Sequence, residues 1–318
     1  MSYPDQSLLS MLQYRSKQIA MDKTDVTLCQ LLLTNSRLSY RELAHKLNLS
    51  MTAVHARIQS LVELGVIRRF TAKVSFGALK AVHVMIFGAS VKTPLHDLNG
   101  ELAKHGSIYW LAIGGGNFLY VGAYLKSITE LEPLVDYVKK TAGLLEPTAG
   151  LVSWQYPIDA YEVSDTTLHG LDYQIIRSLS DNSRKATSDV AEELGVSAKT
   201  VRRRLLRMMR VGLIELSIEW YPDASNDIMT VFHFRLKSES DKGVLGGILQ
   251  KFWPNIIFYW GFSNIPNSYI AFVWTNTMKE LKSVRERFEH EAVVQSVSPN
   301  ILYTGYIFKT WIDRLVEK

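Results

Sequence analysis

The residues between Ser197 and Gly212 have the composition of a surface that binds phosphate. They include one lysine and five arginines and no acidic residue, a local charge of +6. Exposed helices usually mix Glu with Lys, because opposite charges three or four residues apart stabilise one another. Six like charges repel, and the sequence offers no acid close by. Phosphate groups would relieve this repulsion, and arginine can also bind guanine through O6 and N7. We therefore expect this segment to contact a DNA duplex.

The elements that must present this segment occur twice in the chain. Residues 35–67 align with residues 182–214 at an offset of 147, and ten of the 33 pairs are identical. The match extends upstream to Asp25 and Asp172. The identical pairs are Asn35/Asn182, Ser36/Ser183, Arg37/Arg184, Ala44/Ala191, Leu47/Leu194, Ser50/Ser197, Val54/Val201, Arg57/Arg204, Gly65/Gly212 and Ile67/Ile214. The chain is thus an internal duplication with copies of roughly 150 residues, an ordinary size for one or two small domains.

Local signals predict three short helices at the start of the first copy. Asp22 caps the first helix, Ser39 forms a capping box with Glu42 at the second, and Ser50 caps the third. Gly65 suits the left-handed conformation that follows a helix end. This order is the helix-turn-helix plan, in which the third helix remains exposed and fits the major groove of DNA.

The exposed faces of the two third helices supply the predicted DNA contacts. The first of them is uncharged overall between Ser50 and Gly65, with one arginine and one glutamate. The basic strand that follows it, residues 68–73, is typical of a wing that anchors phosphate. The predicted contacts are Ser50, Thr52, His55, Arg57, Arg68 and Arg69 in the first copy and Ser197, Lys199, Thr200, Arg202, Arg203, Arg204 and Arg207 in the second.

Two long stretches, residues 106–125 and 252–278, carry no charge. Each is interrupted by turn-forming residues, Gly114–Asn117 in one and Ser263–Asn267 in the other, and each is rich in aromatic and β-branched residues beside the turn. We interpret them as buried β-hairpins and not as membrane spans.

Around these hairpins each copy has the order β-α-β-β-α-β, which is the ferredoxin-like pattern. The fold class is therefore α+β, with two winged helix-turn-helix domains and two ferredoxin-like domains in tandem. A sheet with both helices on one face leaves an apolar face bare, and that face needs another sheet, from the other copy or from a second chain. The expected parts are an N-terminal helix or extension (1–20), winged helix-turn-helix domains (21–75 and 168–222) and ferredoxin-like domains (76–160 and 226–318).

Composition excludes several classes of protein. The 318 residues are 47% hydrophobic and 21% charged, which is ordinary for globular domains, and the net charge is +5. A single cysteine, Cys29, rules out an intrachain disulfide and a cysteine-based zinc site. The first 18 residues lack the pattern of a secretory signal. We expect a cytoplasmic protein with no metal and no cofactor.

The helix-turn-helix segment resembles the Lrp/AsnC, or feast/famine, transcription regulators. The resemblance is carried over about 45 residues by residue types and spacing, and more loosely by the ferredoxin-like part. It implies a regulator that binds double-stranded DNA. Ordinary family members have one copy and dimerise through their sheets, so this chain resembles two fused members, either a pseudo-dimer by itself or part of a homodimer. The residues that match are Asp25, Asn35-Ser36-Arg37-Leu38-Ser39-Tyr40-Arg41-Glu42-Leu43-Ala44, Leu49-Ser50, Val54, Arg57-Ile58, Leu61 and Leu64-Gly65-Val66-Ile67.

The same resemblance implies a site for a small, amino-acid-like effector at the turn between the two middle strands. Main-chain amides at a glycine turn could hold a carboxylate there. The family pattern has a glycine and an acid before an aromatic residue, whereas this chain has Asn117-Phe118 and its second copy lacks the glycine. A plain hairpin turn is the alternative interpretation. The candidate effector residues are Gly114, Gly115, Asn117, Asn264 and Asn267.

The sequence leaves two other functions open. A distant branch with the same two-domain plan resembles sirohaem decarboxylases, but this sequence lacks their His-Asn-Tyr segment and its histidines are scattered. Neither a phosphate-binding loop nor an HExxH or Gly-x-Ser-x-Gly motif is present, so we predict no catalytic residues and no enzyme. The other alternative is a scaffold on the same fold that has lost DNA contact.

Overall fold

The computed structural model describes residues 20–92, 97–156, 167–237 and 242–317. The predicted N-terminal helix lies outside the described residues. The elements are α2 (Lys23–Thr34), α3 (Tyr40–Leu47), α4 (Met51–Glu63), β1 (Ile67–Val74), β2 (Val82–Ala89), α5 (Leu98–Leu102), β3 (Ile108–Gly114), η1 (Gly115–Asn117), β4 (Phe118–Leu125), η2 (Ile128–Glu130), α6 (Leu131–Ala142), β5 (Thr148–Tyr156), α7 (Gly170–Leu179), α8 (Thr187–Leu194), α9 (Ala198–Arg210), β6 (Ile214–Trp220), η3 (Pro222–Ala224), β7 (Ile228–Leu236), α10 (Lys242–Lys251), β8 (Ile256–Phe262), β9 (Ser268–Thr275), α11 (Met278–Glu289), β10 (Val294–Ile307) and α12 (Trp311–Arg314).

Both copies begin with the predicted three helices, and the local signals act as expected. Asp22 and Ser39 each form a capping box at the start of α2 and α3. Ser50 and Ser197 cap α4 and α9, each accepting a hydrogen bond of 3.1 Å from a backbone N–H three residues on. Gly65, like its equivalent in the second copy, has a positive φ. Caps and left-handed turns of this kind depend only on neighbouring residues, which is why the sequence reveals them.

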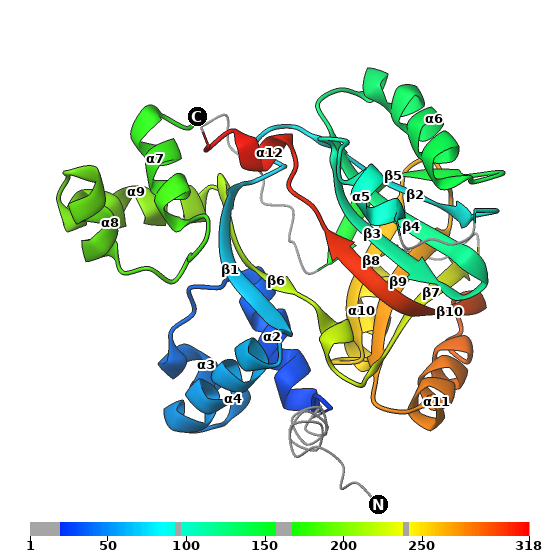
Figure 1. The fold of residues 1–318 in the computed structure, drawn as a ribbon. Coiled ribbons are helices and arrows are strands. Elements are labelled where there is room, and N and C mark those ends of the chain that lie inside the picture. Colours follow the sequence, from blue (N-terminus) through cyan, green and yellow to red (C-terminus); the bar gives the residue numbers. More distant parts are fainter. Residues whose placement is uncertain (1–19, 93–96, 157–166, 238–241, 318) are drawn as a thin grey trace, which may run out of the picture.

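The two ferredoxin-like sheets join into one closed barrel with the strand order β10-β3-β4-β2-β5-β8-β9-β7. The last strand of each copy pairs with the second strand of the other: β5 with β8, and β10 with β3. The bare sheet faces thus become the barrel interior, and closure within one chain removes the exposed edges. The helices α5 and α6 pack on the outside of the first half and α10 and α11 on the second (Figure 1).

Burial on both faces explains the two uncharged stretches. In β2, Val84 and Ile86 pack beneath α5 and α6, whereas Met85 between them belongs to the core that includes the barrel interior. The hairpins β3–β4 and β8–β9 have the same two-sided burial, so neither face leaves room for a charge. The hairpin interpretation is confirmed, and no helix within the described ranges is long and apolar enough to cross a membrane.

The last strand, β10, is the longest strand within the described residues, and it begins at Val294. Its first part pairs with β7 of its own copy up to Ile301, and the part from Leu302 pairs with β3 of the other copy. The first part alternates buried and exposed residues less regularly, so its sequence alone does not indicate a strand.

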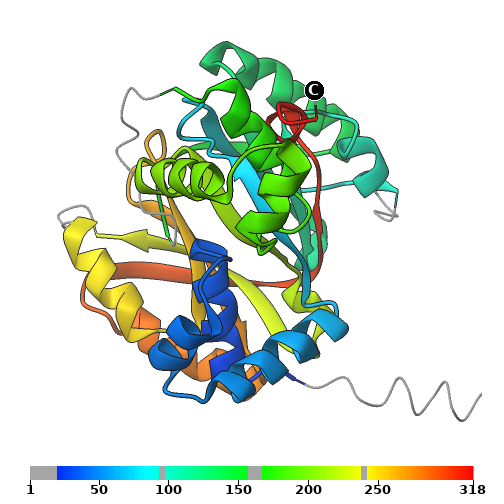
Figure 2. The ribbon, with the colours of Figure 1, turned by 90° about the vertical axis from the view of Figure 1, so that its left-hand side faces the viewer.

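A strand follows each helix-turn-helix domain, the predicted basic strand β1 in the first copy and β6 in the second, and neither projects as a free edge. Instead, β1 pairs antiparallel with β6, so that Val74 lies opposite Ile214 and Ile67 opposite Trp220. The resulting two-stranded ribbon connects the two helix-turn-helix domains, which lie on the same side of the barrel (Figures 1 and 2).

Candidate nucleic-acid interface

The helix α9 presents a cationic face to solvent. Its inward residues Val201, Leu205 and Met208 are buried, whereas Arg202, Arg203 and Leu206 between them are exposed. Four cations on this helix and its first turn are exposed and have no ion-pair partner in the described part of the chain: Lys199, Arg202, Arg203 and Arg210.

An acid on another helix relieves part of the positive charge of α9, which corrects the expectation drawn from its sequence. Asp172 on α7 is fully buried, and its two carboxylate oxygens lie 3.1 Å from Arg204 and 2.8 Å from Arg207. These two guanidinium groups therefore hold α9 against α7. The acid is 32 residues before Arg204 in the chain, so an inspection of neighbouring residues does not find it.

The first copy contains the same contact. Arg57 of α4 lies 2.6 Å from Asp25 and 2.9 Å from Asp22. Burial alone would lower the pKa of Arg57, but the hydrogen bonds that Arg57 donates to Asp25 and Asp22 raise it. With Arg57 neutralised, α4 offers the exposed Thr52 and His55, and the His55 ring lies 5.2 Å from that of Tyr40.

The arginines predicted to anchor phosphate from a wing are occupied inside the ribbon. The guanidinium of Arg68 lies 3.5 Å above the ring of Tyr221. Arg69 bonds to Glu219 on the opposite strand and lies 2.6 Å from Asp181, and the bond to Glu219 raises its pKa. Because β6 pairs with this strand, Arg68 and Arg69 lie on a two-stranded ribbon, and their contact with phosphate stays a prediction.

A reciprocal set of bonds fixes the two helix-turn-helix domains to one another. Ser36 and Ser183 hydroxyls are 2.6 Å apart. Arg184 donates to the carbonyls of Ser36 and Leu38 at 2.7 and 3.0 Å, and Arg37 donates to the carbonyls of Ser183 and Lys185. Burial and the charge of Arg184 lower the pKa of Arg37. Identical residues meet across a pseudo-two-fold axis, as a self-complementary interface requires.

These contacts explain several identities in the repeat by a structural role, which differs from the DNA contact predicted for Arg57 and Arg204. The Asn-Ser-Arg triplets form the domain interface, and Asp25/Asp172 with Arg57/Arg204 form the ion pair that orients each third helix. The usable signal was the constant spacing of 32 residues between acid and arginine in both copies.

The candidate effector residues do not gather into one site. Asn117 and Asn267 occupy equivalent turn positions with φ of 55° and 58°, a conformation that asparagine tolerates well. Asn264 is held by main-chain bonds of 2.8 Å to Leu151 and Ala149. Gly114 and Gly115 pack against Asn300 of β10. Effector binding at this turn stays a prediction.

Comparisons with known proteins agree with this architecture. The AsnC-type helix-turn-helix domain family matches residues 21–62 and 169–209. A curated, uncharacterised HTH-type transcriptional regulator of Pyrococcus furiosus is 28% identical over 137 residues, which are 42% of this chain and 93% of the relative. The HTH-type transcriptional regulator LysM of Sulfurisphaera tokodaii is 23% identical over 133 residues, 41% of this chain and 94% of the relative.

A solved structure aligns with nearly the whole molecule. It is the siroheme decarboxylase NirDL, with a TM-score of 0.58 at 12% identity, covering 93% of this chain and 97% of that one. At this identity the likeness concerns the fold alone.

The fold and the matches define a protein with two AsnC-type helix-turn-helix domains joined to one barrel of ferredoxin-like halves. Single-copy regulators are each matched along nearly their full length by less than half of this chain. The chain thus contains two AsnC-type helix-turn-helix domains, and its similarity to these regulators is consistent with a tandem duplication.

Proposed function

We propose that this chain is a transcription regulator that binds double-stranded DNA as a pseudo-dimer, without enzymatic activity, in the cytoplasm. The observation that carries the proposal is the free cationic face of α9, on a helix that is capped at Ser197 and braced by α8. An exposed helix of this kind fits the major groove, where its first turns can meet base edges.

The domain interface supports the same function. Two recognition helices can bind one duplex together only if their separation is fixed. The bond between Ser36 and Ser183 fixes it, together with the bonds that Arg37 and Arg184 each donate to the opposite domain. Because α4 and α9 differ in sequence, a single chain should prefer an asymmetric operator. If two chains associate, the composite operator regains two-fold symmetry.

The salt dependence of binding tests the proposal. Because Arg204 and Arg207 are bonded to Asp172, four cations of α9 remain free to contact phosphate, so log K against log salt should have a slope of about −3.6. The measurement is fluorescence anisotropy of the purified full chain with duplexes selected from random sequence. A slope near zero on every duplex would overturn DNA binding and favour the scaffold function.

A matched pair of charge changes separates the interface from general charge. Arg202→Ala removes an exposed cation from α9, and Arg235→Ala removes an exposed cation from β7 of the barrel. The first should weaken DNA binding and the second should leave it unchanged. Equal loss in both variants would contradict a defined interface on α9.

The decarboxylase function has a direct test because NirDL shares the fold. Purified protein is titrated with an iron tetrapyrrole while absorbance is recorded in the Soret region. We expect no shift. A saturable shift together with release of carbon dioxide would contradict the proposed regulator function and show that the protein is an enzyme.

A further inference from the structure

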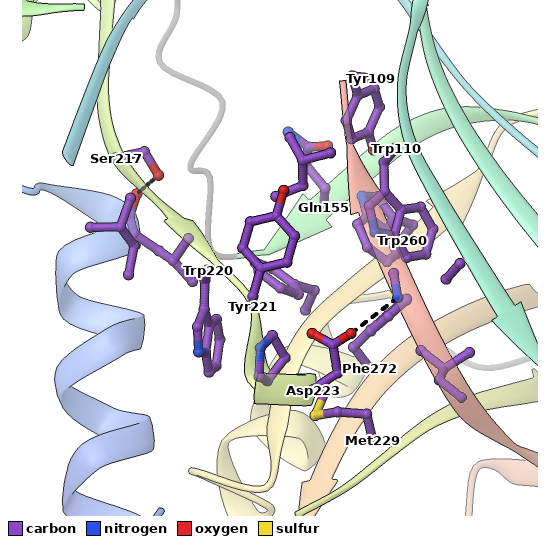
Figure 3. A pocket seen from close by; sticks show the side chains of 18 of the residues that line it. Tyr109, Trp110, Gln155, Ser217, Trp220, Tyr221, Asp223, Met229, Trp260 and Phe272 are labelled. Carbon is purple, nitrogen blue, oxygen red and sulfur yellow. Dashed lines mark hydrogen bonds between the residues drawn. The ribbon is translucent and has the colours of Figure 1, made fainter. Parts of the chain in front are cut away.

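A cavity of about 470 Å³ lies between the β1–β6 ribbon and the barrel (Figure 3). Its volume falls within the range of small-molecule sites, about 300–1,000 Å³. Both copies contribute to its walls, with Tyr109 and Trp110 from β3, Trp260 from β8, Phe272 from β9 and Trp220 from β6. None of the residues predicted from sequence to bind DNA or an effector lines it.

The walls favour a flat aromatic occupant. The Trp110 and Trp260 rings are 6.5 Å apart, and both stand nearly edge-on to Phe272, at 5.1 and 5.3 Å. Phe258 stacks beside Trp260 and also contacts Trp220, at 5.9 and 6.0 Å. Aromatic faces and edges arranged in this way pack against another ring with favourable quadrupole geometry.

One polar group of the lining lacks a partner. Trp220 is 6% exposed, and no acceptor within the described part of the chain bonds to its Nε1. This nitrogen has almost no accessible surface, so Trp220 offers its ring and not a hydrogen bond to an occupant of the cavity.

The charges around the cavity select against anions. Its lining contains three carboxylates, Glu215, Asp223 and Asp227, and a single cation, Lys73, which lies 2.9 Å from Asp313 outside the lining. Among the residues that the structure describes, Asp223 accepts only long bonds, 3.4 Å from Thr304 and 3.3 Å from the Gly305 amide (Figure 3). Aromatic faces beside carboxylates stabilise a cation through both cation–π and ionic attraction.

From these observations we infer that the cavity binds a flat aromatic organic cation. The rings of Trp110, Trp260 and Phe272 would contact this cation, and Asp223 would balance its charge. The site is separate from the surface of helix α9, and its test needs no DNA. The result of that test therefore does not depend on the proposed function.

The test uses two fluorescent aromatic probes of opposite charge with the purified full chain. Berberine is a flat aromatic cation, and 1-anilinonaphthalene-8-sulfonate is an anion of comparable size. We expect berberine to bind at one site per chain, at least about tenfold more tightly than the anion, which corresponds to about 1.4 kcal/mol. Preference for the anion, or for the tetrapyrrole hemin, would overturn the assignment.

Four variants locate the site. Ala112→Phe fills the cavity from β3 and should abolish saturable berberine binding; if thermal unfolding shows that this variant does not fold, Trp260→Ala serves in its place. Asp223→Asn should weaken berberine several-fold without weakening the anion. Leu145→Ala removes an apolar side chain that is 65% exposed and outside the lining, and should change nothing.

The pattern of losses decides the outcome. Berberine binding that survives in both the filled and the Trp260 variants would place the probe elsewhere and overturn the site. Equal loss of both probes in Asp223→Asn would overturn the assigned charge class, and a loss in Leu145→Ala equal to that in Trp260→Ala would mark the binding as unspecific.

Discussion

The helices α4 and α9 occupy equivalent places in the two copies but differ in charge. Both are capped by serine, both bury three apolar residues, and both hold an arginine against an acid of the first helix of their domain. Beyond this shared frame, α9 has four free cations and α4 has none among its described outward residues. Duplication thus preserved the parts that position a recognition helix and left its reading face free to diverge.

The largest expected difference between the copies concerns the buried acids. Asp172→Ala removes a fully buried carboxylate that bonds to both Arg204 and Arg207, and these partly exposed arginines can then reach water, so we expect a loss of about 3 kcal/mol in the free energy of unfolding of that domain, the lower end for a broken buried pair. In Asp25→Ala the side chain of Arg57 keeps Asp22, so the loss should be near 1 kcal/mol. Urea unfolding at neutral pH measures both. Equal losses would contradict the asymmetry.

Each copy also buries one histidine, at non-equivalent positions. The Nδ1 of His83 is 2.9 Å from Gln155 Oε1, which can only accept, so its neutral ring carries the proton there and Nε2 accepts from Tyr109 at 3.0 Å. His233 Nε2 lies 2.6 Å from the Tyr120 hydroxyl. Burial lowers the pKa of both histidines from 6.5 to about 4.

These lowered pKa values predict acid sensitivity. Below pH 6.5 the unfolded chain binds protons that the folded chain excludes, so stability is full above pH 6.5 and is lost progressively as the pH falls toward 4. Each histidine should cost about 3 kcal/mol at pH 4. Urea unfolding of the parent and of His233→Gln at pH 7 and pH 5 checks this. A stability that does not change between these pH values would show that the rings are protonated in the folded state.

A smaller contrast is expected in DNA binding. Arg202→Ala and Arg203→Ala in α9 should each cost about 1–3 kcal/mol if the side chain reads a base, with a changed sequence preference. Thr52→Ala and His55→Ala in α4 remove no permanent charge and should leave the salt slope unchanged. Selection of bound duplexes from a random pool measures both. A uniform loss over all sequences would instead identify the arginine as a phosphate anchor.

The smallest contrast is a missing cap. Ser39 caps α3 in a box with Glu42, whereas its equivalent, Ala186, gives α8 no side-chain cap although Asp189 stands where the second partner belongs. We expect Ala186→Ser to stabilise the second domain by about 1 kcal/mol and Ser39→Ala to destabilise the first by a similar amount. Thermal unfolding of the two variants provides the measurement, and a destabilised Ala186→Ser would refute this account of the cap.

Much of the fold could be predicted because its signals are local. The capping boxes at Asp22 and Ser39, the left-handed Gly65 and the turns of the two hairpins each depend on residues a few positions apart. The candidate interface was harder to predict from the sequence. The sequence identified the cationic helix, but it could not separate Arg202, which is exposed, from Arg204, which is bonded to an acid on another helix.

By itself the sequence determined the duplication, the order of elements in each copy and the two recognition helices, because repeated caps and periodic apolar residues act over short distances. Only the tertiary structure decided that β1 pairs with β6, that the sheets close into one barrel, and which arginines remain free. Strand edges and buried acids find their partners through space, and a partner far away in the chain leaves no mark on the residues beside it. The cavity beneath the ribbon likewise exists only because both copies meet there.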